Sequence, residues 1–415
     1  MRPDQLEPEL ADIVARVRSF VRDVVVPAEP RPGEALDPEE LARLSQLARE
    51  AGVYAPVSSK AHGGLGLPLP AWSPVLQEAG YSPIGPAVLN CMAPDEGNMH
   101  MLSLIATDEQ KEQFLGPLVR GEVRSAFAMT EPHPGAGSDP AALATTARPD
   151  GDEWVLDGTK RFISGANDAE VAIIMARTPE WTDEDGTTHE AGATMFLTRT
   201  DVPGWRVGAQ IETTEKVIAG GHPYVHIEGM RLPRSAVLGE VGQGFRYAQV
   251  RLGPARLTHC MRWLGLARRS LDVALDRAEH RELFGSQMRN LGLAQALIAD
   301  SVIDIETSDA IIDRTARLLE SDPKAGSAMS SIAKVHCAEA IQRVVDRSIQ
   351  LCGGDGVSEA LPLMQYLLEV RPFRIYDGSS ETHRWAISRR ASSARRKQVE
   401  AGAERLDVVT PQEEG

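Results

Sequence analysis

The stretch Ala126–Asp139, AFAMTEPHPGAGSD, lies where the pattern of the chain changes. Before it, apolar residues recur at helical spacing, and after it short β-rich runs alternate with turn signals. A β-rich run ends at Thr130, and a Glu-Pro pair leads into a loop that contains Gly135, Gly137 and Ser138. Such a loop can present backbone N–H groups and a hydroxyl to an anion or a heterocycle. Taken alone, the loop is read equally well as a surface turn.

The sequence on either side of this stretch divides into three predicted domains and a tail. Residues 1–124 are predicted to form a helical domain, and residues 125–238 a β domain built as a barrel or sandwich. One expected strand of the β domain is Arg161–Ser164. Residues 239–395 carry long apolar stripes at helical spacing and are predicted to form a helical bundle. Residues 396–415 are polar and are expected to be a flexible tail.

Composition excludes several classes of function. The chain has 415 residues and a formal net charge of −15, which argues against nucleic-acid binding and against docking on an anionic membrane. The four cysteines are scattered, so neither a disulfide framework nor a metal site is expected. No apolar run approaches the ~20 residues that a membrane span needs. We therefore expect a cytoplasmic enzyme, although a removed targeting peptide would leave the same sequence.

Two further motifs combine groups that a flavin needs. In Gly158–Gly165, GTKRFISG, Phe162 offers a flat ring and Ser164 a hydroxyl two residues away on the same strand face. A routine hairpin strand is the simpler interpretation of this motif alone. In RELFG, Arg281 can clamp a pyrophosphate through charge-assisted hydrogen bonds, or it can complement a helix dipole.

Two motifs lie near the C-terminal end. The stretch 350–356, QLCGGDG, is typical of a helix that ends in a glycine cluster, which either caps the helix or lets a ligand approach the backbone closely. In RIYDGSSETHR, residues 374–384, Asp377 precedes Gly378, so the backbone can bend sharply there and expose the carboxylate. Asp377 is thus a candidate general base, although an Asp-Gly pair is most often only a turn.

The order and spacing of these five motifs resemble the acyl-CoA dehydrogenase family over nearly the whole chain. The segment Arg251–Arg262, RLGPARLTHCMR, further resembles a subfamily that includes kinase-fused mitochondrial members and many bacterial enzymes. The resemblance implies an α+β fold with an N-terminal helical domain, a central β-barrel or sandwich domain and a C-terminal four-helix bundle. It also implies FAD as the cofactor, bound between the β domain and the bundle.

The resemblance carries the family's functional positions onto this sequence. Phe162 stands where many relatives have Trp against the flavin ring, and Ser164 stands where relatives have Thr near the flavin N5. Arg281 and Gln350 match residues that reach the FAD of a neighbouring subunit, so at least a homodimer, and usually a homotetramer, is implied. The positions that match cofactor contacts are Phe127, Met129, Thr130, Ser138, Phe162, Ile163, Ser164, Arg281, Phe284, Gln350, Gly353, Gly354, Ser379 and Glu381. Those that match substrate contacts are Ser138, Arg256 and Gly378.

Asp377 matches the catalytic base, which is Glu in the best-known branches of the family. The resemblance implies that Asp377 removes the α-proton of an acyl-CoA while a β-hydride moves to flavin N5, which gives a trans-2-enoyl-CoA. Burial is expected to raise the pKa of this carboxylate toward working pH. An electron-transfer flavoprotein is the implied acceptor of the electrons. A flavin-dependent oxidase or monooxygenase on the same fold, and a non-catalytic flavoprotein that binds acyl thioesters, remain alternatives.

Overall fold

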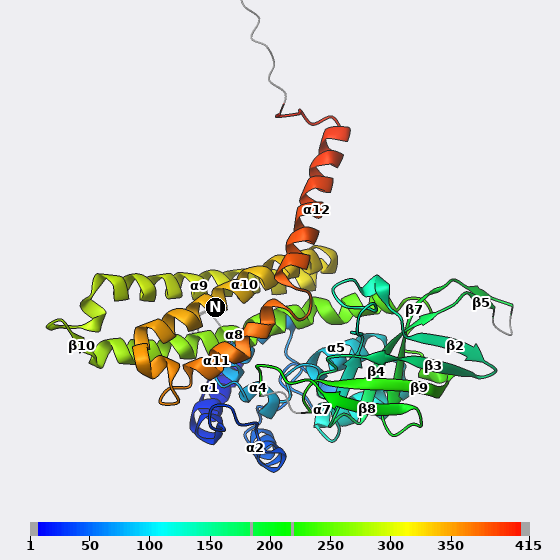
Figure 1. Ribbon diagram of the computed structural model, residues 1–415, viewed down its shortest axis with the longest axis horizontal. Helices are drawn as coiled ribbons and strands as arrows, with labels where there is room; N and C mark the ends of the chain where they lie inside the picture. The colour runs from blue at the N-terminus through cyan, green and yellow to red at the C-terminus, as the bar shows by residue number, and fades with distance from the viewer. Residues whose placement is uncertain (1–6, 183–185, 217–219, 408–415) are drawn as a thin grey trace, which may run out of the picture.

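The computed structural model describes residues 7–182, 186–216 and 220–407, and it confirms the predicted fold class. A group of helices, a β domain and a second group of long helices follow one another along the chain. The β domain lies beside one end of the long helices, and the N-terminal helices pack under the place where the two meet (Figure 1). Residues from all three parts therefore come together in the middle of the molecule.

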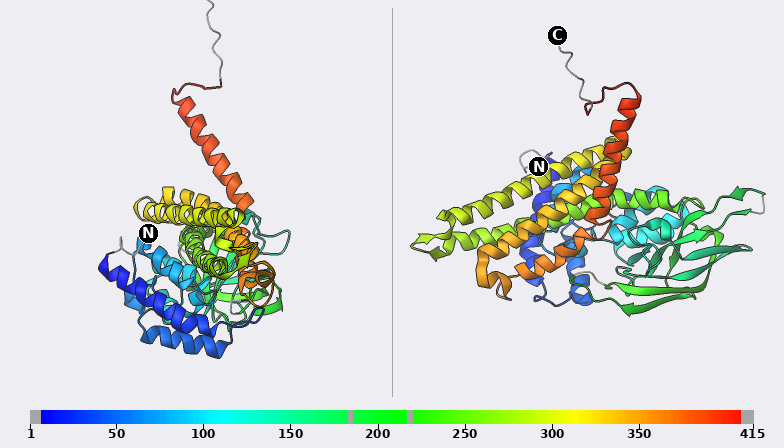
Figure 2. Two further views of the ribbon diagram at one scale, coloured as in Figure 1. Left: turned by 90° about the vertical axis from the view of Figure 1, so that its left-hand side faces the viewer. Right: turned by 45° about the horizontal axis from the view of Figure 1, so that its top comes forward.

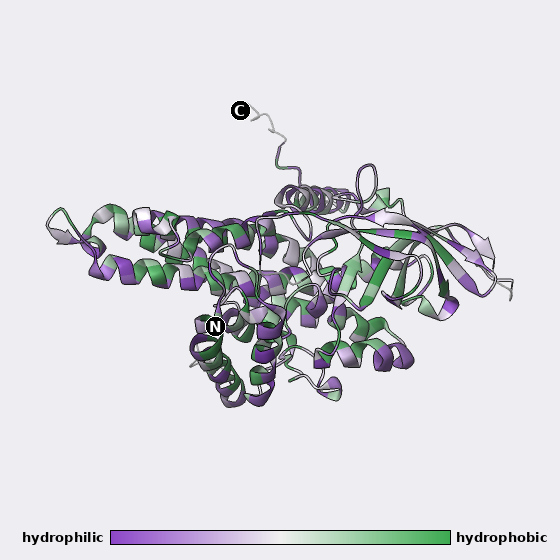
Figure 3. Cartoon of the chain, turned by 60° about the horizontal axis from the view of Figure 1, so that its bottom comes forward, coloured by the Kyte–Doolittle hydropathy of each residue, from purple (hydrophilic) through white to green (hydrophobic). Residues whose placement is uncertain are grey.

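The N-terminal helices bury one apolar stripe each. Val14, Val17 and Phe20 are buried on the inner face of the first helix, while its charged residues face outward. Figure 3 shows the same alternation of hydrophobic and hydrophilic faces on this group of helices. Thr107 and Gln110 form a capping box that starts a later helix. The helices are α1 (Pro8–Phe20), α2 (Pro38–Glu50), α3 (Leu69–Ala79), α4 (Gly85–Val88), α5 (Asp95–Ile105), α6 (Asp108–Gln110) and α7 (Gly116–Arg120).

The β domain is built on one curled sheet of seven strands. Its order is β1-β4-β2-β3-β9-β8, with β7 pairing β4, and most of its pairs are antiparallel. Two further strands, β5 and β6, pair antiparallel with each other in a separate two-stranded sheet. The strands are β1 (Ser125–Ala128), β2 (Thr146–Asp150), β3 (Glu153–Lys160), β4 (Val171–Thr178), β5 (Trp181–Thr182), β6 (Thr188–His189), β7 (Gly192–Arg199), β8 (Trp205–Gln210) and β9 (Pro223–Pro233).

The expected strand Arg161–Ser164 is wrong. Strand β3 ends at Lys160, and Phe162 has φ of 56°, which a strand residue does not adopt. The chain therefore turns out of the sheet at this point. The turn changes how Phe162 and Ser164 are presented, since they lie on a bend and not on one face of a strand.

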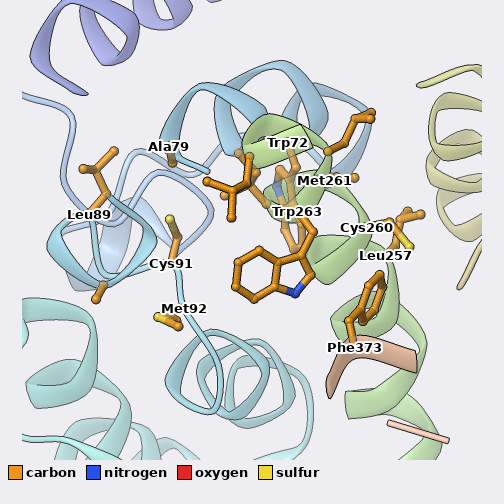
Figure 4. Close-up of a cluster of buried hydrophobic side chains, with 14 of the residues drawn as sticks. Trp72, Ala79, Leu89, Cys91, Met92, Leu257, Cys260, Met261, Trp263 and Phe373 are labelled. Atoms are coloured by element: carbon orange, nitrogen blue, oxygen red, sulfur yellow. The ribbon is translucent and has the colours of Figure 1, made fainter. Parts of the chain in front are cut away.

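The C-terminal part is built around α8 (Gly244–His280), a helix of 37 residues. It packs along α9 (Gly292–Ser321) and α10 (Pro323–Cys352), and α11 (Leu363–Val370) packs on α10. The apolar side of α8 also meets the N-terminal helices. Figure 4 shows Trp263 and Met261 of α8 in one cluster with Trp72 and Ala79 of α3. One continuous core thus joins the first and last parts of the chain.

Helix α12 (Ser380–Glu400) stands away from the rest of the molecule in both views of Figure 2. It begins beside α10 and ends at Glu400, so it continues past residue 396, where the tail was expected to begin. Among the residues described, we find no helix with the length and apolar character needed to cross a bilayer.

Candidate active site

A cavity of about 790 Å³ lies where the three parts of the chain meet. Its walls come from the loop after β1, the bend after β3, one face of α8 and the segment between α11 and α12. The size is within the usual range for a cofactor or small-molecule site. Ten of the residues selected from the sequence line it: Phe127, Met129, Thr130, Ser138, Phe162, Ser164, Arg256, Asp377, Gly378 and Ser379.

The loop after β1 is held by the buried carboxylate of Glu131. Its oxygens accept hydrogen bonds from the backbone N–H groups of Ala136, Ala144 and Thr145 at 3.0, 2.6 and 2.9 Å. They also accept one from the Lys160 ammonium at 2.8 Å. Burial opposes ionisation, but Lys160 and these hydrogen bonds lower the pKa of Glu131 to about 2. Glu131 therefore shapes the loop that presents Ser138 to the cavity.

The bend after β3 presents an aromatic ring and a hydroxyl. Phe162 is 42% exposed in a wall of the cavity, although large aromatic side chains are usually well buried. The Ser164 hydroxyl lies 2.9 Å from Nδ1 of His222. Nε2 of His222 lies 2.8 Å from the Glu215 carboxylate, but the contact is not aligned as a hydrogen bond. The sequence pattern did not point to His222 or Glu215.

Asp377 lies on a sharp bend that three side chains hold in place. Its φ is 53° and that of Gly378 is 92°. The carbonyl oxygen of Asp377 accepts hydrogen bonds from Arg256 Nε and His383 Nε2, both at 3.1 Å. The carbonyl oxygen of Gly378 accepts one at 2.7 Å from Lys334, a fully buried lysine. A Cβ at Gly378 would lie 2.7 Å from His383, so glycine is needed here both for its φ and for the space. The bend predicted from the Asp-Gly pair is present.

The Asp377 carboxylate faces the cavity, but its pKa shifts in the direction opposite to our expectation. Its side chain is 19% exposed, and Nε2 of His259 lies 3.3 Å from Oδ2. Burial alone would raise the pKa of Asp377. The contact with His259 and the charges of Arg251 and Arg256 outweigh burial, so the pKa lies well below its ordinary value. The expected rise is therefore wrong, because the prediction from sequence did not include the basic residues that surround this carboxylate.

His259 is held in one tautomer by its neighbour Arg262. The Nη2 of Arg262 lies 3.1 Å from Nδ1 of His259, and an arginine can only donate, so Nδ1 must accept. The proton of the neutral ring is therefore on Nε2, which faces Asp377. Burial and the charge of Arg262 lower the pKa of His259, so the ring is neutral at pH 7. Arg262 in turn lies 3.3 Å from the Glu96 carboxylate of α5.

Most of the remaining selected residues lie at the far end of the bundle. Phe284 is 96% exposed in the hairpin after α8, which β10 (Glu282–Leu283) and β11 (Ser286–Gln287) form and which carries the label β10 in Figure 1. Arg281 precedes it, and the C-terminal end of α10 lies close by, since Arg277 of α8 pairs with Asp355 at 2.7 Å. The selected residues exposed at this end are Arg281, Phe284, Gln350, Gly353 and Gly354. None of these five lines the cavity of the same chain.

Two selected residues lie outside both groups. The side chain of Ile163 is buried in the core of the β domain, so only its backbone is available to a ligand. Glu381 is exposed in the first turn of α12, where an acidic side chain complements the helix dipole. Ser379 caps that helix, because its hydroxyl accepts a hydrogen bond from Thr382 N at 3.2 Å.

One face of α8 contributes residues to the cavity that no sequence motif indicated. Arg251, Ala255, His259 and Arg262 follow one another at spacings of four, four and three residues, and all four line the cavity. This spacing was available in the sequence, and it places the side chains on one side of a helix. The sequence does not show that this side of the helix faces Asp377 and not solvent.

Known families and proteins match this chain over most of its length. Family models described as the N-terminal, middle and C-terminal domains of acyl-CoA dehydrogenase match residues 7–122, 126–226 and 242–392. The relative named "Probable acyl-CoA dehydrogenase FadE2" from Mycobacterium tuberculosis is 34% identical over 376 residues, and the match covers 90% of each chain. Acyl-CoA dehydrogenase family member 11 from Gallus gallus is 33% identical over 404 residues, which cover 91% of this chain and 50% of that relative. The chain thus spans about half the length of that relative.

Solved structures show the same fold. A solved structure from Mycobacterium abscessus has a TM-score of 0.84 and 33% identity, and the match covers 94% of this chain and 99% of that one. Butyryl-CoA dehydrogenase from Megasphaera elsdenii has a TM-score of 0.80 at 24% identity, with 94% and 99% covered.

Proposed function

The chain belongs to the acyl-CoA dehydrogenase family, and from this membership we propose that it oxidises an acyl-CoA to the trans-2-enoyl-CoA with Asp377 as the base. The observation that carries the proposal is the position of Asp377. Its carboxylate faces the cavity from a bend whose two carbonyl groups are held by Arg256, His383 and Lys334. A carboxylate fixed in this way can be aimed at one carbon of a bound thioester.

FAD is the cofactor of this family, and when bound it accepts the β-hydride at N5. The cavity fits a flavin, because an exposed aromatic ring and several hydroxyl groups line the same space. Phe162 would cover the ring system, Thr130 and Ser164 would hydrogen-bond to its polar edge, and Ser138 would lie nearer the pyrophosphate. Ile163 would contribute through its backbone.

Residues of this chain would remove the α-proton, bind the thioester oxygen and contact the substrate. Asp377 would take the α-proton, and its backbone N–H would bind the thioester oxygen, where negative charge grows as the proton leaves. Arg256 and Gly378 would contact the substrate near the base. Ala255 has no group that accepts a proton, which supports Asp377 as the base on this side of the cavity.

The exposed group at the far end of the bundle supports a shared cofactor site. Phe284 and Arg281 extend into solvent there, next to the glycines that end α10. An exposed aromatic residue at the tip of a hairpin is typical of a contact with another molecule. We assign this end of the bundle to the FAD of a neighbouring copy in a homodimer or homotetramer. Glu381 and Ser379 would lie near the adenosine half, and an electron-transfer flavoprotein would accept the electrons.

The test is anaerobic mixing of the purified FAD-containing protein with a panel of acyl-CoA thioesters. Loss of the oxidised flavin absorbance with one class of thioester, and its absence in Asp377→Asn, would support both the reaction and the base. The asparagine variant must retain FAD and bind the same thioester for the comparison to count. No loss of absorbance with any thioester in protein that holds FAD would refute the proposal.

A further inference from the structure

A buried histidine and a buried glutamate lie behind Ser164, and the proposed function gives neither of them a role. The Ser164 hydroxyl lies 2.9 Å from Nδ1 of His222, and Nε2 of the same ring lies 2.8 Å from the Glu215 carboxylate. All three residues line the cavity, and the side chains of His222 and Glu215 are 8% and 7% exposed. The three side chains therefore connect a buried carboxylate to a hydroxyl in the cavity wall.

Backbone hydrogen bonds hold Ser164 opposite His222. The residues on either side of Ser164 donate backbone N–H groups to the carbonyl oxygens on either side of His222, namely Ile163 to Pro223 at 3.1 Å and Gly165 to Gly221 at 2.8 Å. Because these bonds bracket both side chains, neither residue can shift along the other, and the contact between the hydroxyl and Nδ1 is fixed by the backbone.

Contacts on both sides of Glu215 hold its carboxylate in place. The Thr214 hydroxyl donates to the carbonyl oxygen of Leu368 at 3.0 Å. The Lys216 N–H donates to the Glu369 carboxylate at 2.8 Å. The residues before and after Glu215 are thus attached to α11, so the carboxylate between them is held against the histidine ring.

This carboxylate determines which nitrogen of His222 carries a proton. The contact between Nε2 and Glu215 is not aligned as a hydrogen bond, but an unprotonated Nε2 at 2.8 Å would set its lone pair against those of the carboxylate. The proton of the neutral ring is therefore on Nε2, and Nδ1 is an acceptor. A hydroxyl has one proton, so Ser164 donates it to Nδ1 and can only accept a hydrogen bond from a molecule in the cavity.

From this fixed direction we infer that His222 and Glu215 are positioning residues, which make Ser164 a hydrogen-bond acceptor toward N5 of FAD. The inference rests on the proposed function, in which Ser164 contacts the polar edge of the flavin. N5 of oxidised FAD offers only a lone pair, whereas N5 of reduced FAD carries a proton. An oxygen that can only accept therefore stabilises the reduced cofactor, which makes FAD a better acceptor of the substrate hydride.

The test measures the midpoint potential of the bound FAD by anaerobic reductive titration against a reference dye. The titration is made at about pH 8, above the range in which an unperturbed histidine changes its charge. Ser164→Ala removes the acceptor, so the potential should fall; if the hydroxyl instead donated to N5 of oxidised FAD, the same change would raise the potential. His222→Leu frees the Ser164 proton to point toward N5, so it should lower the potential as well.

The expected shift corresponds to one hydrogen bond. At a given solution potential, each of the two variants should have a ratio of reduced to oxidised FAD that is about three- to tenfold lower than that of wild type. For a two-electron couple this change equals about 15–30 mV.

A double variant and a control variant separate this role from a structural one. In Ser164→Ala/His222→Leu the potential should equal that of Ser164→Ala, because His222 acts only through the hydroxyl. His226→Leu removes a histidine of β9 that lies 3.4 Å from the Thr159 hydroxyl and does not line the cavity, so it should leave the potential unchanged.

Three results would overturn the inference: a rise in the potential of Ser164→Ala, no change in it, or a fall caused by His222→Leu that persists without the hydroxyl. If His222→Leu loses FAD, the sign of the shift in Ser164→Ala still decides. The titration uses no thioester. It therefore decides the inference even if no acyl-CoA reduces the flavin and the proposed function fails.

Discussion

Replacing His259 with leucine should raise the pKa of Asp377 by about one unit. A hydrogen bond to a charged group contributes about 1.5–3 kcal/mol, and one pKa unit corresponds to about 1.36 kcal/mol. The Nε2–Oδ2 contact of 3.3 Å is long and is not aligned as a hydrogen bond, so it contributes no more than about the lower end of this range. The pKa of Asp377 is held low in the native enzyme, and a base acts only when ionised. The acid limb of the kcat/KM profile should therefore move to higher pH by about one unit.

The measurement is the pH dependence of kcat/KM with one thioester, for wild type, His259→Leu and His259→Gln. Glutamine keeps an N–H donor near the position of Nε2, so its profile should lie closer to that of wild type. Thermal midpoints of the three proteins control for loss of fold. An acid limb that stays in place in the leucine variant, while kcat falls at every pH, would show that His259 is needed for structure and does not act on Asp377.

Three further changes test other parts of the structure. Glu131→Gln leaves the Lys160 ammonium buried without a charged partner, so denaturant unfolding should show a loss of about 3–5 kcal/mol; a loss below about 1 kcal/mol would contradict the role given to this pair. Burial lowers the pKa of Lys334 to about 8 in the folded protein. Between pH 8 and 10.5 the unfolded chain therefore binds more protons at this lysine than the folded chain does, so the free energy of unfolding increases with pH. Lys334→Met should remove about 2 kcal/mol of the stability gain between pH 7.5 and 9.5, and it should lower kcat because Gly378 loses its donor; an unchanged pH dependence of unfolding would be inconsistent with a charged, buried Lys334. Phe284→Ala should weaken self-association and retention of flavin, measured by sedimentation velocity and absorbance, with little change in the stability of the isolated chain; if both stay at wild-type values, the far end of the bundle is not an interface.

The sequence predicted the order of the three parts because helical and β periodicities differ and the turn residues mark the changes. It predicted the bend at Asp377 because an Asp-Gly pair favours positive φ. It misassigned Phe162, since a β-rich composition does not reveal that one residue takes a left-handed conformation. It also missed Arg251 and His259, because a basic residue on a long helix is usually solvated. Only the packing of α5, α8 and the segment before α12 places them around a single carboxylate.

The lowered pKa of Asp377 does not disqualify it as a base, because the charges that lower it act on the substrate as well. Proton transfer moves one negative charge from the carboxylate to the thioester, a few ångströms away, and creates no new charge. At such a distance, the interaction between a unit positive charge and this negative charge amounts to about 4 kcal/mol at an effective dielectric constant of 20. Arg256 lies beside the backbone of Asp377, and in the proposed mechanism that backbone also binds the thioester oxygen. The charge of Arg256 therefore stabilises both the ionised base in the reactant state and the enolate-like state. The barrier depends on the difference between these two stabilisation energies, which are similar in size. A glutamate in a less basic cavity and an aspartate in this one can then reach the same rate by different balances of base strength and substrate acidity.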